Sequence, residues 1–473
     1  MRRSVSWGDR GQIGRYHRSV APPNSYTKGY RECCTCAIIY LSGPTDGGFV
    51  SATLATQCCI AGGGPAGMML GLLMARAGVD VVVLEKHADF LRDFRGDTIH
   101  PSTLTVMDDL GLLDEFLKLP HQRVDRLNAN VYGQSVTIAD FTHLKAARPY
   151  LVLMPQWDFL DFIARQARAY PGFHLHMNTR ATEVIERNGA IVGLRAAADG
   201  SAFDVNGDLL VAADGRDSTI RKSAGLASED LGAPMDVLWF RLSRDAQLDA
   251  EQTGGYVRRG LFLVTLNRGT YWQCAYVIPK GSLEALKARG LDALKAAIGE
   301  VAPFLRQSLA ELRLWDDLKL LTVQVSRMPR WYREGMVCIG DAAHAMSPIG
   351  GVGINLAIQD AVAAANLLAE ALREKRLSTE DLSALQRRRA WPARVTQRMQ
   401  IAVQDEVLVP VLAGQPQGDA GAEPPSLPLA LRILRRLPML SRLPARLVGV
   451  GVRPERVRSR SSSGESRTDT VSE

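Results

Sequence analysis

The feature that most constrains this 473-residue chain is an apolar stretch of eighteen residues without a charge, CCIAGGGPAGMMLGLLMA, at Cys58–Ala75. Its length is close to that of a membrane-spanning helix. Three consecutive glycines followed by Pro65 would interrupt such a helix near its middle, because glycine and proline disfavour helical hydrogen bonding. The stretch therefore predicts a strand at 56–61, a turn at 62–67 and a helix at 68–77.

A second apolar strand at 80–84 completes a strand–helix–strand unit. Gly62, Gly64 and Gly67 fit G-x-G-x-x-G, and Glu85 ends the second strand eighteen residues further on, a spacing typical of dinucleotide-binding units. The glycines permit a tight turn, close approach of a pyrophosphate and close packing of the helix. Glu85 can bind a ribose hydroxyl, and the helix N-terminus attracts phosphates. A glycine-rich loop without a ligand is the alternative, but the complete unit favours a phosphate site.

Composition and charge exclude several classes of protein. Hydrophobic residues make up 46% and charged residues 23% of the chain, as in globular proteins. Of the net charge of +7, residues 1–50 contribute +4 and residues 427–473 contribute +6, which leaves about −3 for the centre. This distribution is not the footprint of nucleic-acid binding. The seven cysteines lack disulfide-framework or zinc-site spacing, so we expect no metal and a reducing, cytoplasmic location.

The two ends of the chain differ from its centre. Residues 1–53 are polar and arginine-rich without the apolar core of a secretory signal, and we expect a disordered or misassigned extension, with a mitochondrial presequence as the alternative. A linker at 413–426 precedes arginine-bearing amphipathic segments at 427–449. These segments either rest weakly on an anionic membrane surface or pack over the rest of the protein with their arginines exposed. Residues 453–473 are expected to be a disordered basic tail.

Two further motifs follow apolar strands. In LLVAADGRDSTIRKSAG the strand precedes Asp214 and Gly215, which by themselves indicate a tight turn with a helix cap. In GDAAHAMSPIGGVGIN, Asp341 follows a strand and the pattern P-x-x-G-x-G-x-N opens a long helix. These residues offer a carboxylate for a polyol hydroxyl, a glycine backbone for a flat ring and a helix dipole for negative charge. Such a site suits a reduced, anionic flavin.

Together, GGGPAG with Glu85, ADGRDSTIR and GDAAHAMSPIGGVGIN resemble the single-component FAD-dependent monooxygenases of the para-hydroxybenzoate hydroxylase family, over roughly residues 55–385. The resemblance implies an α/β protein of two domains. A Rossmann-like FAD-binding domain would occupy about 54–123, 150–230 and 328–390, within 54–390. An inserted β-rich substrate domain would occupy about 124–149 and 231–327, and a C-terminal helical region would occupy 391–452.

The resemblance also assigns FAD contacts to individual residues. Gly62, Gly64 and Gly67 would meet the pyrophosphate, and Glu85 the adenosine ribose. The remaining assignments are Arg95 on the pyrophosphate side, Gln156 at the start of a helix, Asp214 and Gly215 near FAD and the nicotinamide cofactor, Asp341 on the ribityl chain, and Pro348, Gly351, Gly353, Ile354 and Asn355 along the isoalloxazine ring. No catalytic residue is assigned. We expect His100 and His344 to be structural, and Trp239, Tyr256, Trp272 and Tyr276 either to line a substrate cavity or to form core.

The activity that the resemblance implies is hydroxylation of a small aromatic or quinone-precursor substrate. NAD(P)H would reduce FAD, and O₂ would supply one oxygen atom to the substrate. No second dinucleotide fingerprint is present, as in a family that binds NAD(P)H without a separate domain. A prenyl-lipid reductase and a non-catalytic FAD-binding redox sensor remain alternatives. A flavin-dependent halogenase is disfavoured, because TYWQCAYVIP does not match W-x-W-x-I-P.

Overall fold

The computed structural model describes residues 53–91, 98–245, 253–414, 427–459 and 461. The predicted extension up to residue 52, Arg95, and residues 415–426 of the predicted linker lie outside the described residues, as do residues 460 and 462–473 of the predicted tail.

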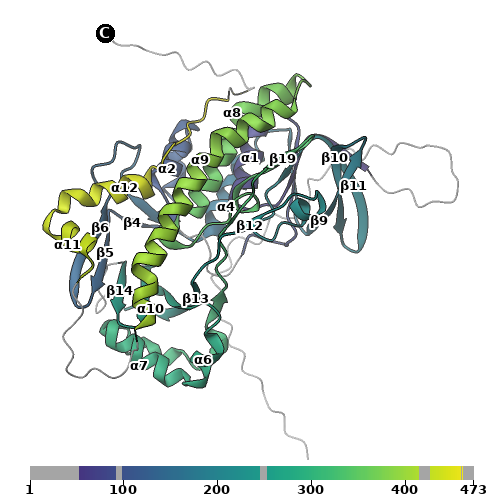
Figure 1. Cartoon of the computed structure of the whole chain (residues 1–473). Coiled ribbons are helices and arrows are strands. Elements are labelled where there is room, and N and C mark those ends of the chain that lie inside the picture. Colours follow the sequence, from purple (N-terminus) through teal and green to yellow (C-terminus); the bar gives the residue numbers. More distant parts are fainter. Residues whose placement is uncertain (1–52, 92–97, 246–252, 415–426, 460, 462–473) are drawn as a thin grey trace, which may run out of the picture. The chain divides into compact units, whose positions relative to one another are not determined.

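The first sheet has eight strands, and its central path runs β19-β20-β11-β1-β2-β8. Its strands β9, β10, β11 and β19 can be followed in Figure 1. The strands are β1 (Thr53–Ala61), β2 (Val81–Leu84), β8 (Phe173–His176), β9 (Thr179–Arg187), β10 (Ala190–Ala198), β11 (Ser201–Ala212), β19 (Tyr332–Arg333) and β20 (Met336–Cys338). Neighbours among β20, β11, β1, β2 and β8 pair in parallel. We call this layer the parallel sheet.

Both faces of the parallel sheet are covered, which explains the unbroken apolar run at the end of β1. Cys58 and Ile60 belong to one core cluster, whereas Cys59 and Ala61 belong to a second cluster on the opposite face. Strands buried on both faces lose the alternation of a half-exposed strand. The strand, turn, helix and strand predicted for residues 56–84 are present in that order, but the helix begins at Pro65 and not at residue 68, because proline fits the first turn of a helix.

Two helices that pack against each other cover one of these faces, α1 (Pro65–Arg76) and α8 (Gly353–Arg373). Among the described residues, Ile349–Arg373 is the one helical segment long and apolar enough to cross a membrane. However, 83% of its apolar window is buried inside the fold. This burial is what a core helix requires, since its apolar side chains pack against α1 and the sheet.

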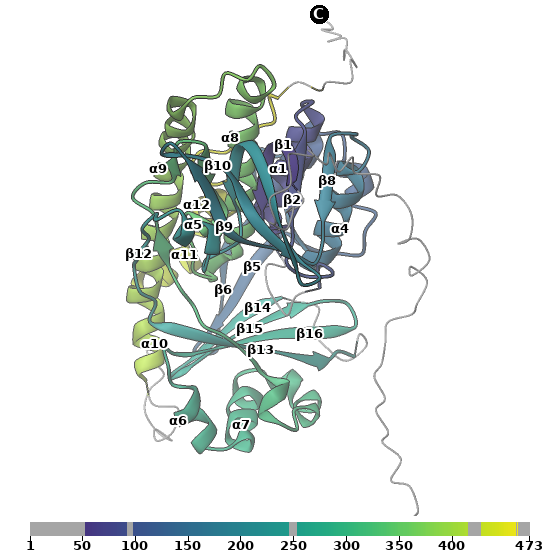
Figure 2. The ribbon, with the colours of Figure 1, turned by 90° about the vertical axis from the view of Figure 1, so that its right-hand side faces the viewer.

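The second sheet has seven strands in the order β17-β13-β16-β15-β14-β5-β6 (Figure 2). Its strands lie in the segments for which the resemblance predicts a substrate domain, and we therefore call it the substrate-side sheet. Its strands are β5 (Arg126–Val131), β6 (Gln134–Asp140), β13 (Met235–Ser243), β14 (Gly254–Arg258), β15 (Leu261–Asn267), β16 (Tyr271–Pro279) and β17 (Lys319–Leu321). Strands β15 and β16 are consecutive in the chain and pair antiparallel. Two distant stretches of sequence therefore build one sheet, because β14 pairs in parallel with β5.

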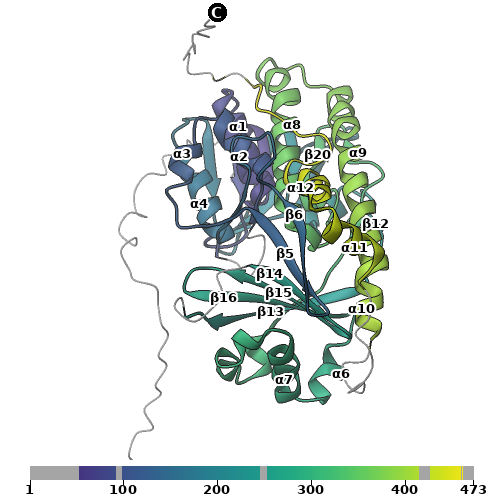
Figure 3. The same cartoon turned by 90° about the vertical axis from the view of Figure 1, so that its left-hand side faces the viewer.

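The C-terminal helices connect the two sheets. Helix α9 (Thr379–Val403) continues through a π-helical turn, Gln404–Leu408, into α10 (Val409–Ala413). Ala393 of α9 packs into the core of the parallel sheet, whereas Leu408 packs against the substrate-side sheet. The helices α11 (Leu429–Arg436) and α12 (Arg442–Gly449) then pack on β6 (Figure 3).

The chain finally returns to the parallel sheet through Arg453–Ser459. The backbone of Arg458 and Ser459 donates hydrogen bonds to Asn366 of α8, and Arg456 forms an ion pair with Asp109. The prediction of a disordered tail from residue 453 onward is therefore wrong for 453–459. The composition of this segment did not predict its ordered contacts, because these contacts join residues far apart in the sequence.

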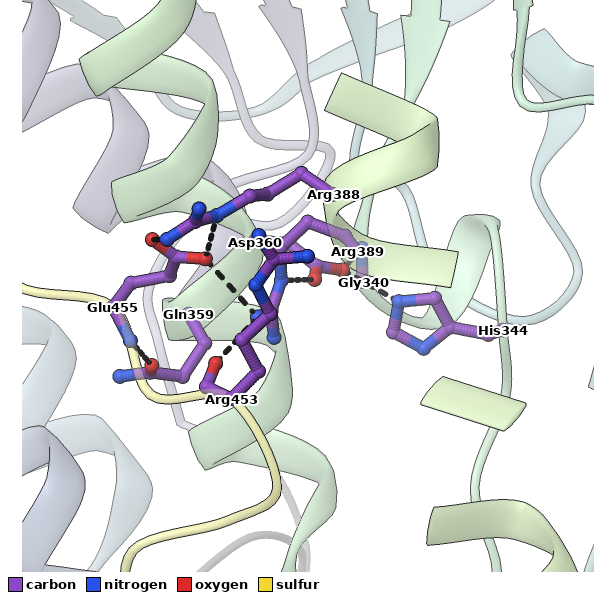
Figure 4. Close-up of polar contacts among 8 residues, drawn as sticks. All are labelled: Gly340, His344, Gln359, Asp360, Arg388, Arg389, Arg453 and Glu455. Carbon is purple, nitrogen blue, oxygen red and sulfur yellow. Dashed lines mark hydrogen bonds and ion pairs between the residues drawn. The ribbon is translucent and has the colours of Figure 1, made fainter. Parts of the chain in front are cut away.

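A buried ion network anchors this returning segment (Figure 4). Asp360 of α8 is fully buried and accepts hydrogen bonds from Arg389 Nε at 2.8 Å and from the backbone N–H of Gly340 at 3.1 Å. His344 Nε2 lies 2.5 Å from the same carboxylate. Arg389 also donates to the carbonyl of Arg453 at 3.1 Å. One carboxylate thus joins α8, α9 and the loop after β20.

Burial by itself raises the pKa of the Asp360 carboxyl group, but His344 and Arg389 outweigh it by charge attraction and hydrogen bonding. They hold the pKa of Asp360 below its ordinary value, so this group is charged at neutral pH. Removing Arg389 leaves a buried charge without full compensation.

We predict that Arg389→Met lowers the free energy of unfolding by about 3–5 kcal/mol, because Asp360 and Glu455 lose a buried cation. Denaturant unfolding monitored by tryptophan fluorescence measures the change. Arg394→Met, an exposed position on the same helix, is the matched control and should change stability by less than about 0.5 kcal/mol. Equal effects of the two substitutions would show that the network does not stabilise the fold.

Candidate active site

The three sequence motifs meet at one edge of the parallel sheet. In the strand register, Ala61 lies beside both Leu84 and Ala212, and Ala212 lies beside Cys338. The residues that follow these four strand ends therefore lie in one row. Ligands of open α/β sheets bind at this carboxyl edge. Parallel pairing has brought together residues that are up to 280 positions apart in the sequence.

The first motif forms the turn between β1 and α1. Gly62 has φ of +109°, and a Cβ atom there would lie 2.4 Å from the carbonyl oxygen of Ala213. A Cβ atom at Gly67 would lie 2.0 Å from the carbonyl oxygen of Gly62. Both positions therefore exclude any larger residue. Gly64 is different, because no protein atom lies within 4 Å of its Cβ position.

Gly64 is also the N-cap of α1, and no side chain caps this helix end. The first-turn N–H groups of a helix have no partners within the helix and carry a partial positive charge. An open glycine at such an end fits the approach of a phosphate group. The geometry of the turn is therefore that of a pyrophosphate cradle.

Glu85, at the end of β2, is buried and already held by the backbone. Its Oε2 accepts a hydrogen bond from Gly63 N–H at 2.9 Å, and its Oε1 accepts one from His87 N–H at 3.1 Å. These bonds fix the carboxylate beside the glycine turn. This arrangement suits a ribose hydroxyl.

The second motif forms the helix cap that its sequence indicates. Asp214 accepts hydrogen bonds from the Ser218 hydroxyl and, at 3.2 Å, from Ile220 N–H at the start of α5 (Thr219–Ser223). Arg221 is buried and donates to the carbonyl of Ala342 at 2.7 Å. The second motif therefore positions the third motif as well as its own turn.

The third motif packs against the first. A Cβ atom at Gly340 would lie 3.1 Å from Ala66 Cβ and 3.3 Å from Ala357 Cβ, so glycine allows α1, α8 and this loop to touch. Asp341 is half-buried, and its carboxylate lies 3.9 Å from the guanidinium of Arg216.

Residues 345–355, which lead into α8 and include its first three residues, carry the remaining predicted contacts, and we call this segment the glycine loop. Gly351 has φ of +62°, and its Cβ position lies 3.3 Å from Thr98 and 3.7 Å from His100 Nε2. The Asn355 side chain accepts hydrogen bonds from His100 N–H and the Thr103 hydroxyl and donates to the carbonyl of Thr98. Asn355 therefore holds the loop, while Gly353 has no protein atom closer than 4.0 Å to its Cβ position.

Three glutamines of α9 and its π-helical continuation support the glycine loop, and the sequence analysis missed them. Gln400 Nε2 donates to the carbonyls of Ser347 and Ile349, both at 2.8 Å, and its Oε1 accepts from Ser347 N–H. Gln397 Nε2 donates a hydrogen bond to the carbonyl of Ala345, and Gln404 Nε2 donates one to the Ser347 hydroxyl. Their spacing of three, four and seven residues places buried amides on one helix face, a signal that was available in the sequence.

Each of the two histidines near the loop has one ring nitrogen in contact with another part of the fold. His344 is buried in the Asp360 network and stacks 5.0 Å from Trp331. His100 is fully buried, and its Nδ1 lies 2.7 Å from the carbonyl oxygen of Val448 in α12. Burial lowers the pKa of His100 to about 4, although the bond to Val448 opposes part of this shift. His100 is therefore neutral at pH 7, with Nδ1 as donor and Nε2 as acceptor.

The four aromatic residues considered for a substrate cavity lie on two different faces of the substrate-side sheet, because successive side chains of a strand alternate between faces. Tyr256, Trp272 and Tyr276 belong to the core cluster beneath α6 (Leu283–Ala288) and α7 (Leu291–Val301), so they form core. Trp239 packs against the cluster on the opposite face, and Ile349 of the glycine loop packs against that same cluster. Among the described residues, the buried Trp239 Nε1 has no hydrogen-bond partner.

Two predicted contacts have less structural detail. Gln156 is half-buried and is the first residue of α4 (Gln156–Ala167), which packs against α1. Arg95 lies outside the described residues. Both remain predictions.

One sheet edge thus carries a glycine turn, a carboxylate that can bind a ribose hydroxyl, and the glycine loop. These features define a dinucleotide-binding α/β protein with an added β-sheet. Comparison with known proteins identifies the family. The profile of the FAD binding domain family matches residues 55–399. The 6-methylpretetramide 4-monooxygenase of Streptomyces rimosus is 33% identical over 353 residues, which are 73% of this chain and 83% of the relative.

A second relative, para-nitrophenol 4-monooxygenase of Pseudomonas sp. strain WBC-3, is 26% identical over 318 residues, 66% of this chain and 76% of the relative. The solved structure of PqsL from Pseudomonas aeruginosa superposes with a TM-score of 0.65 at 23% identity, over 76% of this chain and 97% of that chain, and shows the shared fold. The chain belongs to the FAD-binding flavoprotein monooxygenases of the para-hydroxybenzoate hydroxylase type. It is an FAD-dependent oxidoreductase that uses NAD(P)H and O₂.

We predict that Gln400→Leu raises the FAD dissociation constant about tenfold, because two carbonyls and one N–H of the glycine loop lose their partner. Titration of the apoprotein with FAD, followed by flavin fluorescence, measures the change. Arg398→Leu, exposed two residues earlier on the same helix, is the matched control. Unchanged affinity in Gln400→Leu would mean that the loop does not need this support.

We also predict a pH dependence of stability from His100. Its folded-state pKa of about 4 lies below the ordinary value of 6.5, so the unfolded chain binds more protons between these values. Its contribution is fully present above pH 6.5 and is lost as the pH falls toward 4, by up to about 3 kcal/mol. Denaturant unfolding should therefore show that the free energy of unfolding falls more steeply below pH 6.5 in the wild type than in His100→Gln. Parallel curves would contradict neutral burial of this histidine.

Proposed function

We propose that FAD lies along the carboxyl edge of the parallel sheet. In this proposal Gly62, Gly64 and Gly67 bind the pyrophosphate and Glu85 binds the adenosine ribose. Asp341 binds the ribityl chain. Gln156, Asp214, Gly215, Arg95, Pro348, Gly351, Gly353, Ile354 and Asn355 complete the site. The observation that supports it best is the open space beside the backbone of Gly64. The Glu85 carboxylate lies next to this turn and is held there by the backbone N–H of Gly63.

We further propose that the substrate is a small aromatic compound of phenol or quinone-precursor type. The two relatives above are named as 4-monooxygenases of 6-methylpretetramide and of para-nitrophenol. The substrate would lie between the glycine loop and the face of the substrate-side sheet that carries Trp239. This apolar face includes Val237, Ala275 and Val277, which suits a flat, largely apolar ring.

The chain's own residues would bind and orient this substrate and keep water away. When bound, FAD supplies the transfer of electrons from NAD(P)H to O₂ and of one oxygen atom to the ring. Trp239 Nε1 would donate a hydrogen bond to a substrate oxygen, which fixes the ring position to be hydroxylated. His100 Nε2 lies beside Gly351 and is a neutral acceptor. It would accept a hydrogen bond from the substrate on the side of the glycine loop. Apolar residues exclude water, which would otherwise waste reduced cofactor.

The proposal includes the cellular setting. Cys58, Cys59, Cys274 and Cys338 are buried free thiols, which agrees with a reducing compartment, and we assign the protein to the cytoplasm. A weak membrane-surface contact through the C-terminal region is part of the same proposal.

The function is tested with purified protein by recording a flavin spectrum and then NAD(P)H oxidation and O₂ uptake over a panel of phenols and quinone precursors. We expect one chemical group of compounds to stimulate O₂ uptake with little peroxide released. Trp239→Phe should lower kcat/KM for that compound about threefold to tenfold, since one hydrogen bond is lost. Trp391→Phe, half exposed on α9, is the control and should leave kcat/KM unchanged.

The remaining outcomes separate the alternatives. Bound FAD with substrate reduction but no O₂ consumption would indicate a prenyl-lipid reductase. Bound FAD without any compound-dependent turnover would indicate a redox sensor. Either result contradicts the monooxygenase proposal.

A further inference from the structure

The C-terminal helices expose an unusual number of apolar side chains. We call residues 427–449, which include α11, α12 and the 3₁₀ turn between them, the C-terminal ridge. Its large hydrophobic side chains with 41–70% exposure are Leu429, Ile433, Leu437, Met439 and Leu443. They are five of the eleven exposed large hydrophobic residues found in the described chain. Leu429 and Ile433 are four residues apart and share one face of α11, and Leu437 follows directly after its last residue.

These exposed side chains are not needed to attach the ridge to the protein. Leu431 and Leu434 on the other face of α11 pack against the core cluster of Val131, Val136 and Val257. Ala445 and Val448 of α12 pack against the separate cluster around Phe141. The ridge therefore has a satisfied inner face and an additional apolar outer face. Natural monomers rarely keep such a surface unless a partner covers it.

The charge of the ridge narrows the choice of partner. Residues 427–453 contain six arginines and no aspartate or glutamate. Arg432, Arg436 and Arg446 are exposed, whereas Arg435 bonds to Gln134 and Arg442 bonds to His143. Apolar side chains interleaved with exposed arginines are typical of helices that lie in the interface of an anionic bilayer.

We propose that the C-terminal ridge docks on the surface of an anionic lipid membrane. The leucines, isoleucine and methionine of the outer face enter the headgroup region, and the exposed arginines bind lipid phosphates. A second copy of this chain fits less well. A two-fold symmetric dimer brings the same patch of both copies together, and arginines without acidic partners would repel one another.

The ridge also touches the glycine loop. The carbonyl oxygen of Val448 lies 2.7 Å from His100 Nδ1, and the Val448 side chain lies 3.6 Å from the Cβ position of Gly350. A membrane that binds the outer face of α12 therefore lies one helix away from the candidate active site. Docking there would bring the site close to lipophilic aromatic compounds dissolved in the bilayer.

Flotation of full-length holoprotein with vesicles tests the proposal. We expect binding to vesicles that contain phosphatidylglycerol and about fivefold weaker binding for each arginine neutralised in Arg432→Gln and Arg436→Gln. Leu437→Asp combined with Met439→Asp should abolish flotation. Leu314→Asp, an equally exposed leucine outside the ridge, is the matched control and should float as the wild type does. Point substitutions are preferable to truncation, because truncation removes Glu455 and its bonds to Arg388.

Each other outcome overturns the proposal. Absence of flotation with vesicles that contain phosphatidylglycerol means that the ridge does not bind an anionic membrane surface. Equal flotation of Leu437→Asp/Met439→Asp and the wild type means that another part of the chain binds lipid. Loss of a dimer in that variant, without vesicle binding by the wild type, would identify a second copy as the partner. Flavin content and substrate-stimulated O₂ uptake, measured on the same samples without vesicles, report separately on the proposed function.

Discussion

The parallel pairing of β1 with β2 and β11 is the constraint on which the candidate site depends. It brings a glycine turn, a carboxylate and a helix cap from distant parts of the sequence to one sheet edge. The pairing also fixes which glycines are obligatory. Gly62 and Gly67 are required because neighbouring carbonyl oxygens occupy the space of their Cβ atoms, whereas Gly64 faces open space that a ligand can use. One turn thus combines packing and binding.

The second half of the site is held by hydrogen bonds from outside the sheet. Asn355 ties the glycine loop to the segment around His100, and Gln400 ties it to α9. These bonds join atoms of the chain itself, so they restrict the loop and reduce the conformational freedom that it would lose on binding. Asp360 extends the same support to the returning C-terminal chain, which is why stability and the shape of the site are linked in this fold.

Local patterns made much of this predictable. The uncharged apolar run, its glycine spacing and Glu85 predicted the first strand–helix–strand unit, because steric demands at each glycine are local. Contacts between distant segments were not predictable in this way. The anchoring of 453–459, the glutamine face of α9 and the separation of Trp239 from Trp272 all depend on which elements pack together. Strand alternation could have separated the two tryptophans only if the register and the covering helices were known.

The most direct test of the account is a crystal structure of the protein with FAD bound. The account predicts the pyrophosphate at the N-terminus of α1 beside Gly64, a ribose hydroxyl on Glu85 and the isoalloxazine ring against Gly351 and Gly353. A flavin bound elsewhere, or a pyrophosphate away from the end of α1, would contradict the central claim that the carboxyl edge of the parallel sheet is the cofactor site.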